Sequence, residues 1–295
     1  MRKKLFTFLL AMASVGTAFA ANGTCGANLT WNLTDGVMTI SGTGTMTNYA
    51  QPSHTPWYNY RSSISSIVIE DGATSIGNNA FSGCNYLSSV TIPNSVVQMG
   101  WSCFQECRCL TSVTIPNSVT NIGSWAFGDC YYLTSVTIGN SVIYINTAAF
   151  ANCYDLISVE IPNSVTYIGD NAFADCENLT SATIGNSVTN IGTYAFSGCN
   201  KLTSITCKAT TPPSLGDYVF SMYTDLLYVP AESVDDYKAA EQWKNFSKIL
   251  PINTEAIEDV NVNSNKIQGT KFFKDGQLII EKNCKTYTIT GQEVK

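Results

Sequence analysis

Cysteine is the residue type with the most chemical potential in this sequence, since the 295 residues contain 11 Cys but only one His. Cys103, Cys107 and Cys109 form a C-x3-C-x-C pattern whose thiolates could ligate a metal ion. Tetrahedral zinc needs four converging ligands, however, and the sequence shows no fourth ligand beside these three. We therefore interpret the pattern as structural and expect neither a metal nor another cofactor.

Histidine chemistry would depend on His54 alone, which lies in a proline-bounded loop at residues 51–57. A catalytic histidine needs a positioned nucleophile and an acid that orients it, and the sequence selects neither. It also shows no carboxylate pair with glycosidase-like spacing and no glycine-rich phosphate loop. We therefore expect a protein that is not an enzyme, and an enzyme built around His54 is the least favoured alternative.

Six of the cysteines recur every 23 residues, and this interval is the strongest pattern in the sequence. A Phe lies three residues before each of them and a Leu three residues after. The unit reads approximately L-T-S-V-T-I-P-N-S-V-T-x-I-G-x-x-A-F-x-x-C-x-x, so the chain is a repeat protein. The cysteines of this structural ladder are Cys84, Cys107, Cys130, Cys153, Cys176 and Cys199.

Each unit predicts one coil of a solenoid. In a typical unit, alternating apolar residues form a short strand, Pro116 ends it, and Asn117 and Ser118 supply turn hydrogen bonds. One coil cannot bury its apolar side chains alone, so neighbouring coils must stack at the strand spacing of about 4.8 Å. Asn146 replaces the repeated glycine once. We expect a positive φ at this position, because Asn is the best substitute for Gly in the left-handed region.

The cysteine ladder has two interpretations. Export would permit disulfides, and the coil spacing lies within the range of Cα separations that a disulfide allows. Identical side chains in one row would have to break their symmetry to pair, however. We therefore favour buried reduced thiols that act as small apolar side chains.

Both ends of a solenoid must be covered. Upstream, residues 29–33 and 37–40 alternate around Asp35-Gly36 and predict a β-hairpin cap. Downstream the repeat pattern stops after Cys207, and a helix beginning at Ser233 is expected to cover the last coil. The apolar residues of this cap are Val234, Tyr237, Trp243 and Phe246.

The two ends of the chain carry signals of their own. Three basic residues, an apolar stretch from Leu5 to Ala13 and an Ala18-Phe19-Ala20 cleavage site predict a signal peptide for export. The sequence has no apolar stretch long enough to predict a transmembrane span. Near the C-terminus, Asp275-Gly276 between apolar segments predicts a β-hairpin.

The unit I-P-N-S-V-T-x-I-G-x-x-A-F-x-x-C resembles the BspA-type (Treponema pallidum-type) leucine-rich repeat of bacterial surface proteins. The resemblance covers roughly residues 23–250, because the segments at both ends also resemble that family. These end segments contain Gly-Thr-Cys-Gly, Pro56-Trp57, Val229-Pro230, Tyr237-Lys238 and Trp243-Lys244. The resemblance implies a curved, surface-exposed solenoid that adheres to host proteins or to other cells. The tail resembles short β modules of exported proteins of the same bacterial group, some of them related to type IX sorting.

The predicted fold is therefore a repeat solenoid of the leucine-rich repeat type, poor in α/β structure, with 23-residue units made mainly of short parallel strands and turns. It has a β cap at the N-terminus, a helical cap at the C-terminus and a small β-hairpin tail. The predicted segments are a signal peptide (1–20), a β cap (21–63), the repeats (64–207), a cap with a helix (208–252), a linker (253–268) and a β module that could serve in sorting or anchoring (269–295).

The outward positions of the repeats form the candidate binding surface. Residues 64–207 contain only nine acidic and two basic residues, since like charges in stacked coils would lie about 5 Å apart. Tyr and Trp are more informative there, because they are enriched at binding interfaces. We expect some on the turn after the Asn-Ser corner and the others just before the repeated Leu, although packing along neighbouring coils is an alternative role. The candidates are Tyr86, Trp101, Trp125, Tyr131, Tyr132, Tyr144, Tyr154, Tyr167 and Tyr194.

The net charge is −6, or about −9 once the signal peptide with its three positive charges is removed, which argues against a nucleic-acid partner. We expect an exported, non-catalytic protein, at the cell surface or secreted, that mediates protein–protein contact or cell adhesion. Its partners would be surface or matrix proteins of a host or a neighbouring cell. The alternative is a glycan-binding accessory protein, favoured if the aromatic residues form flat platforms beside hydroxyls and amides.

Overall fold

A computed structural model of the chain describes residues 20–221, 223 and 226–252, and the backbone of four strands between residues 270 and 294. The expected signal peptide, apart from Ala20, and the expected linker 253–268 lie outside the described residues. Contacts divide the chain into two units, Met1–Leu250 and Pro251–Lys295.

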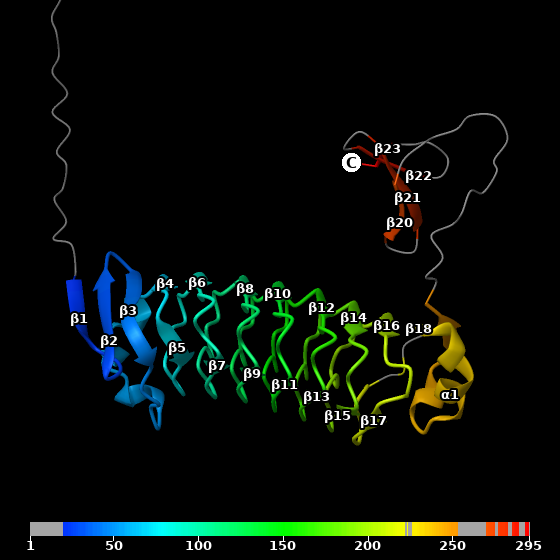
Figure 1. The fold of residues 1–295 in the computed structure, drawn as a ribbon, viewed down its shortest axis with the longest axis horizontal. Coiled ribbons are helices and arrows are strands. Elements are labelled where there is room, and N and C mark those ends of the chain that lie inside the picture. Colours follow the sequence, from blue (N-terminus) through cyan, green and yellow to red (C-terminus); the bar gives the residue numbers. More distant parts are fainter. Residues whose placement is uncertain are drawn as a thin grey trace, which may run out of the picture. The chain divides into compact units, whose positions relative to one another are not determined.

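The first unit contains a solenoid in which each 23-residue repeat forms one coil, as predicted (Figure 1). Each coil contributes one strand to each of two rows. The long-strand row contains β4 (Ser66–Ile69), β6 (Ser89–Thr91), β8 (Ser112–Thr114), β10 (Ser135–Thr137), β12 (Ser158–Glu160), β14 (Ser181–Ile184), β16 (Ser204–Cys207) and β18 (Leu226–Val229). The short-strand row contains β5 (Ala73–Ile76), β7 (Gln98–Met99), β9 (Asn121–Ile122), β11 (Tyr144–Ile145), β13 (Tyr167–Ile168), β15 (Asn190–Ile191) and β17 (Ser214–Leu215).

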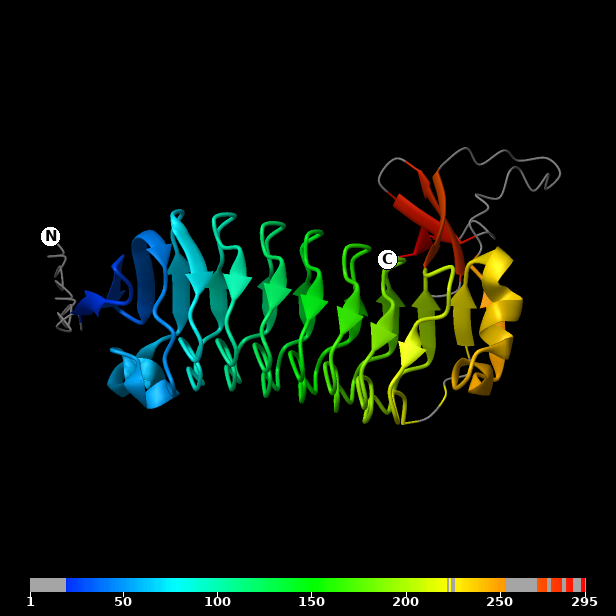
Figure 2. The same ribbon diagram turned by 60° about the horizontal axis from the view of Figure 1, so that its bottom comes forward.

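The coils lie side by side along one axis (Figure 2). Hydrogen bonds join neighbouring coils at several places around their circumference. Parallel pairing is continuous along the short-strand row and interrupted twice along the long-strand row, between β6 and β8 and between β10 and β12. The turns form a further ladder, in which the amide of Phe104 donates to Ala126 O at 2.8 Å. At the Asn-Ser corner the Asn140 amide donates to Asn117 Oδ1 at 2.8 Å, as the turn residues predicted.

An aromatic stack runs through the core of the solenoid, among buried Leu, Ile, Val and Cys side chains. The six repeated Phe residues are buried, and successive rings stack with centroids 5.2–5.4 Å apart. Trp57 extends this stack from Phe81 and Phe220 extends it from Phe196, at 5.4 and 5.7 Å. Each of these two residues lies 24 positions from its neighbour in the stack, so a strict 23-residue period overlooks them.

The repeated glycine has a different role from the one predicted, because the expectation of a positive φ at this position is wrong. A Cβ at Gly123 would lie 2.5 Å from the backbone of Gly100 in the preceding coil, so glycine allows these two coils to approach closely, and Asn146 is the one exception among the repeats. Positive φ occurs instead at two other positions of the coil. The first, with φ from 50° to 59°, is occupied by Asn79, Ser102, Trp125, Ala148, Asn171, Tyr194 and Tyr218. The second, with φ from 57° to 77°, is occupied by Gly83, Glu106, Asp129, Asn152, Asp175 and Gly198.

The N-terminal end of the solenoid is covered by the predicted hairpin and by a strand that the sequence did not predict. The elements of this cap are β1 (Ala20–Thr24), β2 (Asn28–Thr34), β3 (Val37–Thr45) and the 3-10 helices η1 (Pro52–His54) and η2 (Tyr58–Ser63). The strands β1, β2 and β3 pair antiparallel, and β3 then pairs parallel with both β4 and β5. One strand of the cap therefore starts both rows of the solenoid.

The C-terminal end is covered by the predicted helix and the segments beside it. The elements here are η3 (Ala231–Ser233), α1 (Val234–Ala239), η4 (Trp243–Asn245) and β19 (Lys248–Pro251). Trp243 and Phe246 are buried against Phe220, with ring centroids 6.0 and 5.4 Å from it. The sequence placed the last repeat at Cys207, but β17 and β18 still pair in parallel with β15 and β16, so the stacking continues beyond that residue.

The described residues of the second unit form a four-stranded antiparallel sheet. Its strands are β20 (Thr270–Lys274), β21 (Gln277–Lys282), β22 (Lys285–Thr288) and β23 (Glu293–Val294). Lys274 pairs with Gln277, so Asp275-Gly276 connects two antiparallel strands, as its hairpin signal predicted. With the solenoid and its two caps, this sheet confirms the predicted fold class.

Candidate binding surface

The nine aromatic residues expected on the surface lie at three separate places on the coils. Tyr144 and Tyr167 belong to the short strands β11 and β13, which pair directly, rather than to the following turn where the sequence placed them. The residues found in that turn are Trp101, Trp125 and Tyr194. The residues found in the turn after the repeated Cys are Tyr86, Tyr131, Tyr132 and Tyr154.

Trp125 and Tyr194 are exposed aromatic side chains on an unfavourable backbone. Their φ angles are 58° and 59°, and their exposed fractions are 37% and 42%. Tyr218 shares these properties: its φ is 52°, it is 69% exposed, and its ring stacks on Tyr194 with centroids 5.4 Å apart. The sequence did not predict it because it follows the last recognised repeat. A large side chain rarely adopts a positive φ. Other coils place Asn79 and Asn171 at the same position, so neither burial nor the backbone conformation explains these aromatics, and the stack of Tyr194 on Tyr218 leaves both rings exposed.

Tyr131 and Tyr154 illustrate the alternative role that the sequence left open. They are half-buried, and their rings stack with centroids 4.9 Å apart. From the preceding coil, the guanidinium of Arg108 lies 5.0 Å from the ring centroid of Tyr131, and it also pairs with Glu106 at 3.2 Å. These two rings therefore pack along the coils, whereas the seven other candidates are exposed.

The six repeated cysteines form a buried ladder, and five of the six thiols have a carbonyl group as their partner. From Cys107 to Cys199, each thiol donates to the carbonyl oxygen of the Phe 26 residues earlier, with S···O distances of 3.2–3.4 Å. Burial raises the pKa of the Cys84 thiol to about 12 and holds the pKa values of Cys107 and Cys153 well above the usual range. All ten described cysteines are free thiols.

The residues considered for catalysis or metal binding are dispersed. Cys103 and Cys107 point into the core and Cys109 is half-buried. Within the described part of the chain, no three His, Cys, Asp or Glu side chains are grouped as metal ligands. His54 is exposed, with its Nε2 atom 3.0 Å from Nε2 of Gln51, and no described hydrogen bond joins it to a nucleophile or a carboxylate.

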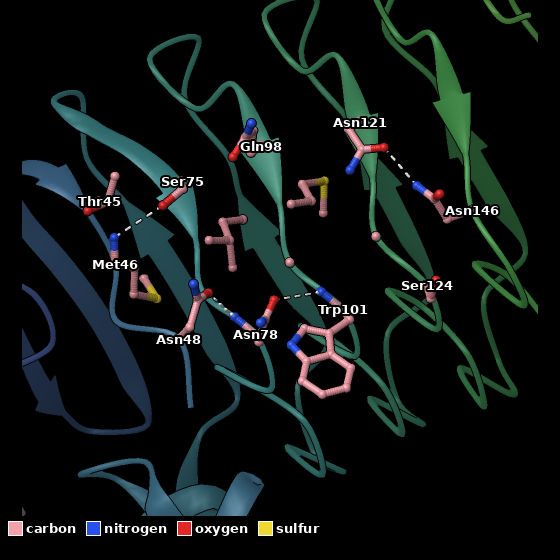
Figure 3. A pocket seen from close by; sticks show the side chains of 14 residues that line it. Thr45, Met46, Asn48, Ser75, Asn78, Gln98, Trp101, Asn121, Ser124 and Asn146 are labelled. Carbon is pink, nitrogen blue, oxygen red and sulfur yellow. Dashed lines mark hydrogen bonds between the residues drawn. The ribbon is translucent and has the colours of Figure 1, made fainter. Parts of the chain in front are cut away.

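A groove that the sequence did not predict runs along the short-strand row near the N-terminal cap (Figure 3). Its volume is about 600 Å³, and its lining contains no charged side chain. Four successive strands contribute to it, β3, β5, β7 and β9, together with the turns that follow them and Asn146, which follows β11. Because these segments are far apart in the chain, no local sequence signal marks the groove. The polar and aromatic side chains that line it are Thr45, Asn48, Ser75, Asn78, Gln98, Trp101, Asn121, Ser124 and Asn146.

The stacked parallel coils, the 23-residue period and the inward Leu, Ile, Phe and Cys ladders define a leucine-rich repeat solenoid. A family model described as "BspA type Leucine rich repeat region" matches the sequence in six copies, over residues 56–176 and 145–278. The chain therefore belongs to the BspA-type leucine-rich repeat family. Proteins of this family are typically non-catalytic surface scaffolds, and membership points to a protein-binding role.

Solved structures of bacterial repeat proteins are similar to the chain. A leucine-rich repeat protein from Eubacterium ventriosum is 19% identical, with 79% of this chain and 85% of that chain covered and a TM-score of 0.36. A leucine-rich cell surface protein from Faecalibacterium prausnitzii is 26% identical, with 72% and 76% covered and a TM-score of 0.38. The Leucine Rich Repeat protein of T. pallidum is 22% identical, with 67% and 88% covered and a TM-score of 0.42. A search among curated proteins finds no match.

The helices of the described chain are short. None of them is both long enough and apolar enough to cross a lipid bilayer. The longest, α1 and η2, contain six residues each.

Proposed function

We propose that this chain is an exported, non-catalytic surface protein that binds partner proteins and so mediates adhesion. One observation carries the proposal: Trp125, Tyr194 and Tyr218 are exposed although each occupies a positive φ. Such a conformation costs a residue with a Cβ about 1–2 kcal/mol. Aromatic side chains kept there despite that cost, on the solvent side of the coil, are best explained by contact with a partner.

The solenoid suits these side chains to binding. Tyr and Trp bury a large area on contact and lose little conformational entropy, which is why they dominate the binding energy of many interfaces. Here the backbone beside them is held by hydrogen bonds between coils, such as that from the Trp125 amide to Thr147 O at 2.9 Å. Little further ordering is therefore needed when a partner binds. The proposed partners are surface or matrix proteins of a host or a neighbouring cell.

Export and attachment are part of the proposal. The signal peptide at 1–20 would direct the chain out of the cytoplasm, and the β module at 269–295 would act in sorting or anchoring. The antiparallel pairing of β20 to β23 supports a separate folded tail. The proposed repeats at 64–207 follow the sequence period, and the proposed cap at 208–252 contains both the last stacked strands, β17 and β18, and the helix.

The test uses the mature chain, residues 21–295, against immobilised matrix proteins and intact cells. A triple variant with Trp125→Asn, Tyr194→Asn and Tyr218→Asn introduces the residue that the chain itself uses at this position in Asn79 and Asn171, so folding should be preserved. We expect binding to be lost.

Tyr144→Asn is the matched control, because Asn121 and Asn190 occupy the equivalent position in other coils. This exposed tyrosine lies outside the turn that carries the three aromatics. Retention of binding by the folded triple variant, or equal loss in the control, would contradict this assignment of the surface.

A further inference from the structure

We propose that the uncharged groove along β5, β7 and β9 is a binding site for a neutral carbohydrate. The proposal goes beyond the protein-binding function and does not depend on it, because the groove uses a different set of side chains. Four of its five side-chain amides, those of Asn48, Asn78, Asn121 and Asn146, form hydrogen bonds within the chain, as Figure 3 shows. The orientation of each amide therefore determines what the groove can offer a ligand.

Two asparagines on one wall of the groove present amide donors. Asn48 Oδ1 accepts a hydrogen bond from the Asn78 amide at 2.9 Å, and Asn78 Oδ1 accepts one from the Trp101 amide at 3.0 Å. Because a backbone N–H occupies each side-chain oxygen, each Nδ2 group keeps its two hydrogens for other partners. The described chain provides no partner for either Nδ2 group.

The end of the groove farther from the N-terminal cap supplies a donor and an acceptor. Asn146 Nδ2 donates to Asn121 Oδ1 and to Ile122 O, both at 2.7 Å. Both hydrogens of Asn146 Nδ2 are thus engaged, so Asn146 Oδ1 remains as an acceptor and Asn121 Nδ2 as a donor. A hydroxyl group both donates and accepts hydrogen bonds, so a row of oriented donors and acceptors is complementary to a sugar.

Trp101 supplies the apolar surface that a sugar ring needs. Its side chain is 50% exposed at the rim of the groove, beside Asn78 (Figure 3). The C–H face of a pyranose ring can stack on an indole while its hydroxyls reach the amides. Aromatic platforms next to hydrogen-bonding groups are also the feature for which the sequence analysis favoured a glycan ligand.

The charge of the groove favours a neutral ligand. No Asp, Glu, Lys or Arg lines it, whereas the second groove, along the long-strand row, contains Glu160 and Lys208, which pair at 3.4 Å. An anionic polysaccharide would find no cation in the groove and would approach a chain of net negative charge. A cationic ligand would find no carboxylate. A neutral chain of sugars requires neither.

Departures from the repeat also occur in this groove. Met99 and Asn146 replace the repeated Ile and Gly, and both line it. The other coils keep a glycine at the position of Asn146, because a Cβ there would contact the preceding coil. Successive coils also place equivalent groups about 4.8 Å apart, close to the length of one sugar unit in an extended polysaccharide. The groove therefore suits a ligand that extends along the solenoid axis.

The test is affinity electrophoresis of the mature chain in native gels that contain mannan, a mixed-linkage β-glucan or arabinoxylan, with heparin as the anionic comparison. We expect at least one neutral polysaccharide to slow migration and heparin to have no effect. Trp101→Ala should weaken binding about tenfold or more, as expected when one stacking contact is lost. Asn146→Gly should also weaken it while restoring the residue that the other coils use.

Trp125→Ala is the matched control, since it removes an exposed Trp that lies outside the groove. The proposal is overturned if no neutral polysaccharide slows migration, if heparin alone does so, or if Trp101→Ala and Asn146→Gly bind as well as the parent chain. Adhesion to matrix proteins is measured separately and should be unaffected by Asn146→Gly. Failure of this site and failure of the protein-binding function therefore give different results.

Discussion

Cys130 shows how the repeat uses a thiol: its Sγ donates to Phe104 O at 3.3 Å, and its side chain is fully buried. Burial raises its pKa, so the thiol stays protonated at neutral pH. A protonated, inaccessible thiol is a poor nucleophile. At the scale of the single residue, this cysteine therefore acts as a small core side chain with one weak hydrogen bond.

Alkylation distinguishes these buried thiols from the single half-buried one. In a Cys284→Ser background, we expect iodoacetamide to modify the native chain at Cys109 and to leave the nine other described thiols unmodified. After denaturation without a reductant, all ten should react, as measured by intact mass. Disulfides in the isolated protein, seen as thiols that fail to react after denaturation, would contradict the thiol ladder.

Two substitutions test the close contact between coils at the repeated glycine and the positive φ of Trp125. Gly123→Ala should destabilise the chain by about 1–3 kcal/mol, because its Cβ would meet the backbone of Gly100 at 2.5 Å. Trp125→Asn should be neutral or stabilising by up to about 1 kcal/mol, because Asn tolerates a positive φ better. Urea unfolding measures both, and a stable Gly123→Ala variant would show that the coils can move apart.

At the scale of the element, the sequence predicted what a local pattern determines. Alternation and a turn signal identified β2 and β3, and Ser233 with an apolar pattern identified α1. The 23-residue period identified the stacked coils and the long-strand row, but it did not predict the second strand of each coil, which forms the short-strand row. The sequence did not predict that Trp57 and Phe220 belong to the aromatic stack, because their spacing of 24 residues breaks the 23-residue period.

The glycine was misassigned for a related reason. The replacement by Asn146 is compatible both with a positive φ and with a close contact, and only the spatial neighbours of the position separate the two. The sequence also predicted which aromatic residues form the candidate surface. It did not predict that they lie at three separate places on the coils. Stacking of Tyr131 on Tyr154 and the amide network around Asn146 both join residues of neighbouring coils. The sequence does not show which residues of those coils meet.

The C-terminal cap should be essential to the solenoid that it covers. Trp243 is buried against the last ring of the stack, and its Nε1 donates to Pro213 O at 2.8 Å. We expect Trp243→Ala to lower the free energy of unfolding by about 3–5 kcal/mol. Trp101→Ala, which removes an exposed Trp, should change it by no more than about 0.5 kcal/mol. Equal effects in urea unfolding would show that the cap does not protect the stack.

At the scale of the whole molecule, the raised pKa values of the buried thiols together make the free energy of unfolding depend on pH. Burial raises the pKa of eight described thiols, including Cys25 to about 11 and Cys84 to about 12, from an ordinary value of 9.0. Because the folded chain holds these protons more tightly, their contribution to stability is complete below about pH 9 and is lost as the pH rises towards the raised values. Each thiol contributes a slope of about 1.4 kcal/mol per pH unit in that window.

Stability should therefore fall steeply between about pH 9 and pH 11, as measured by urea midpoints in the presence of a reductant. A Cys130→Ala/Cys153→Ala variant should start from a lower stability but show a shallower slope, because two of the titrating groups are absent. An identical slope in the parent and the double variant would contradict the role of the ladder.

The carbonyl partners of the thiols also impose an order of events on maturation. Once the coils are stacked, each ladder sulfur is enclosed and an oxidant cannot reach it. Before stacking, the same thiols are evenly spaced along an open chain, where an oxidant could also join two thiols that lie several coils apart in the finished solenoid. Stacking of the coils therefore competes with oxidation of the thiols, and we expect the native form to be reached only where the coils stack before the thiols are oxidised.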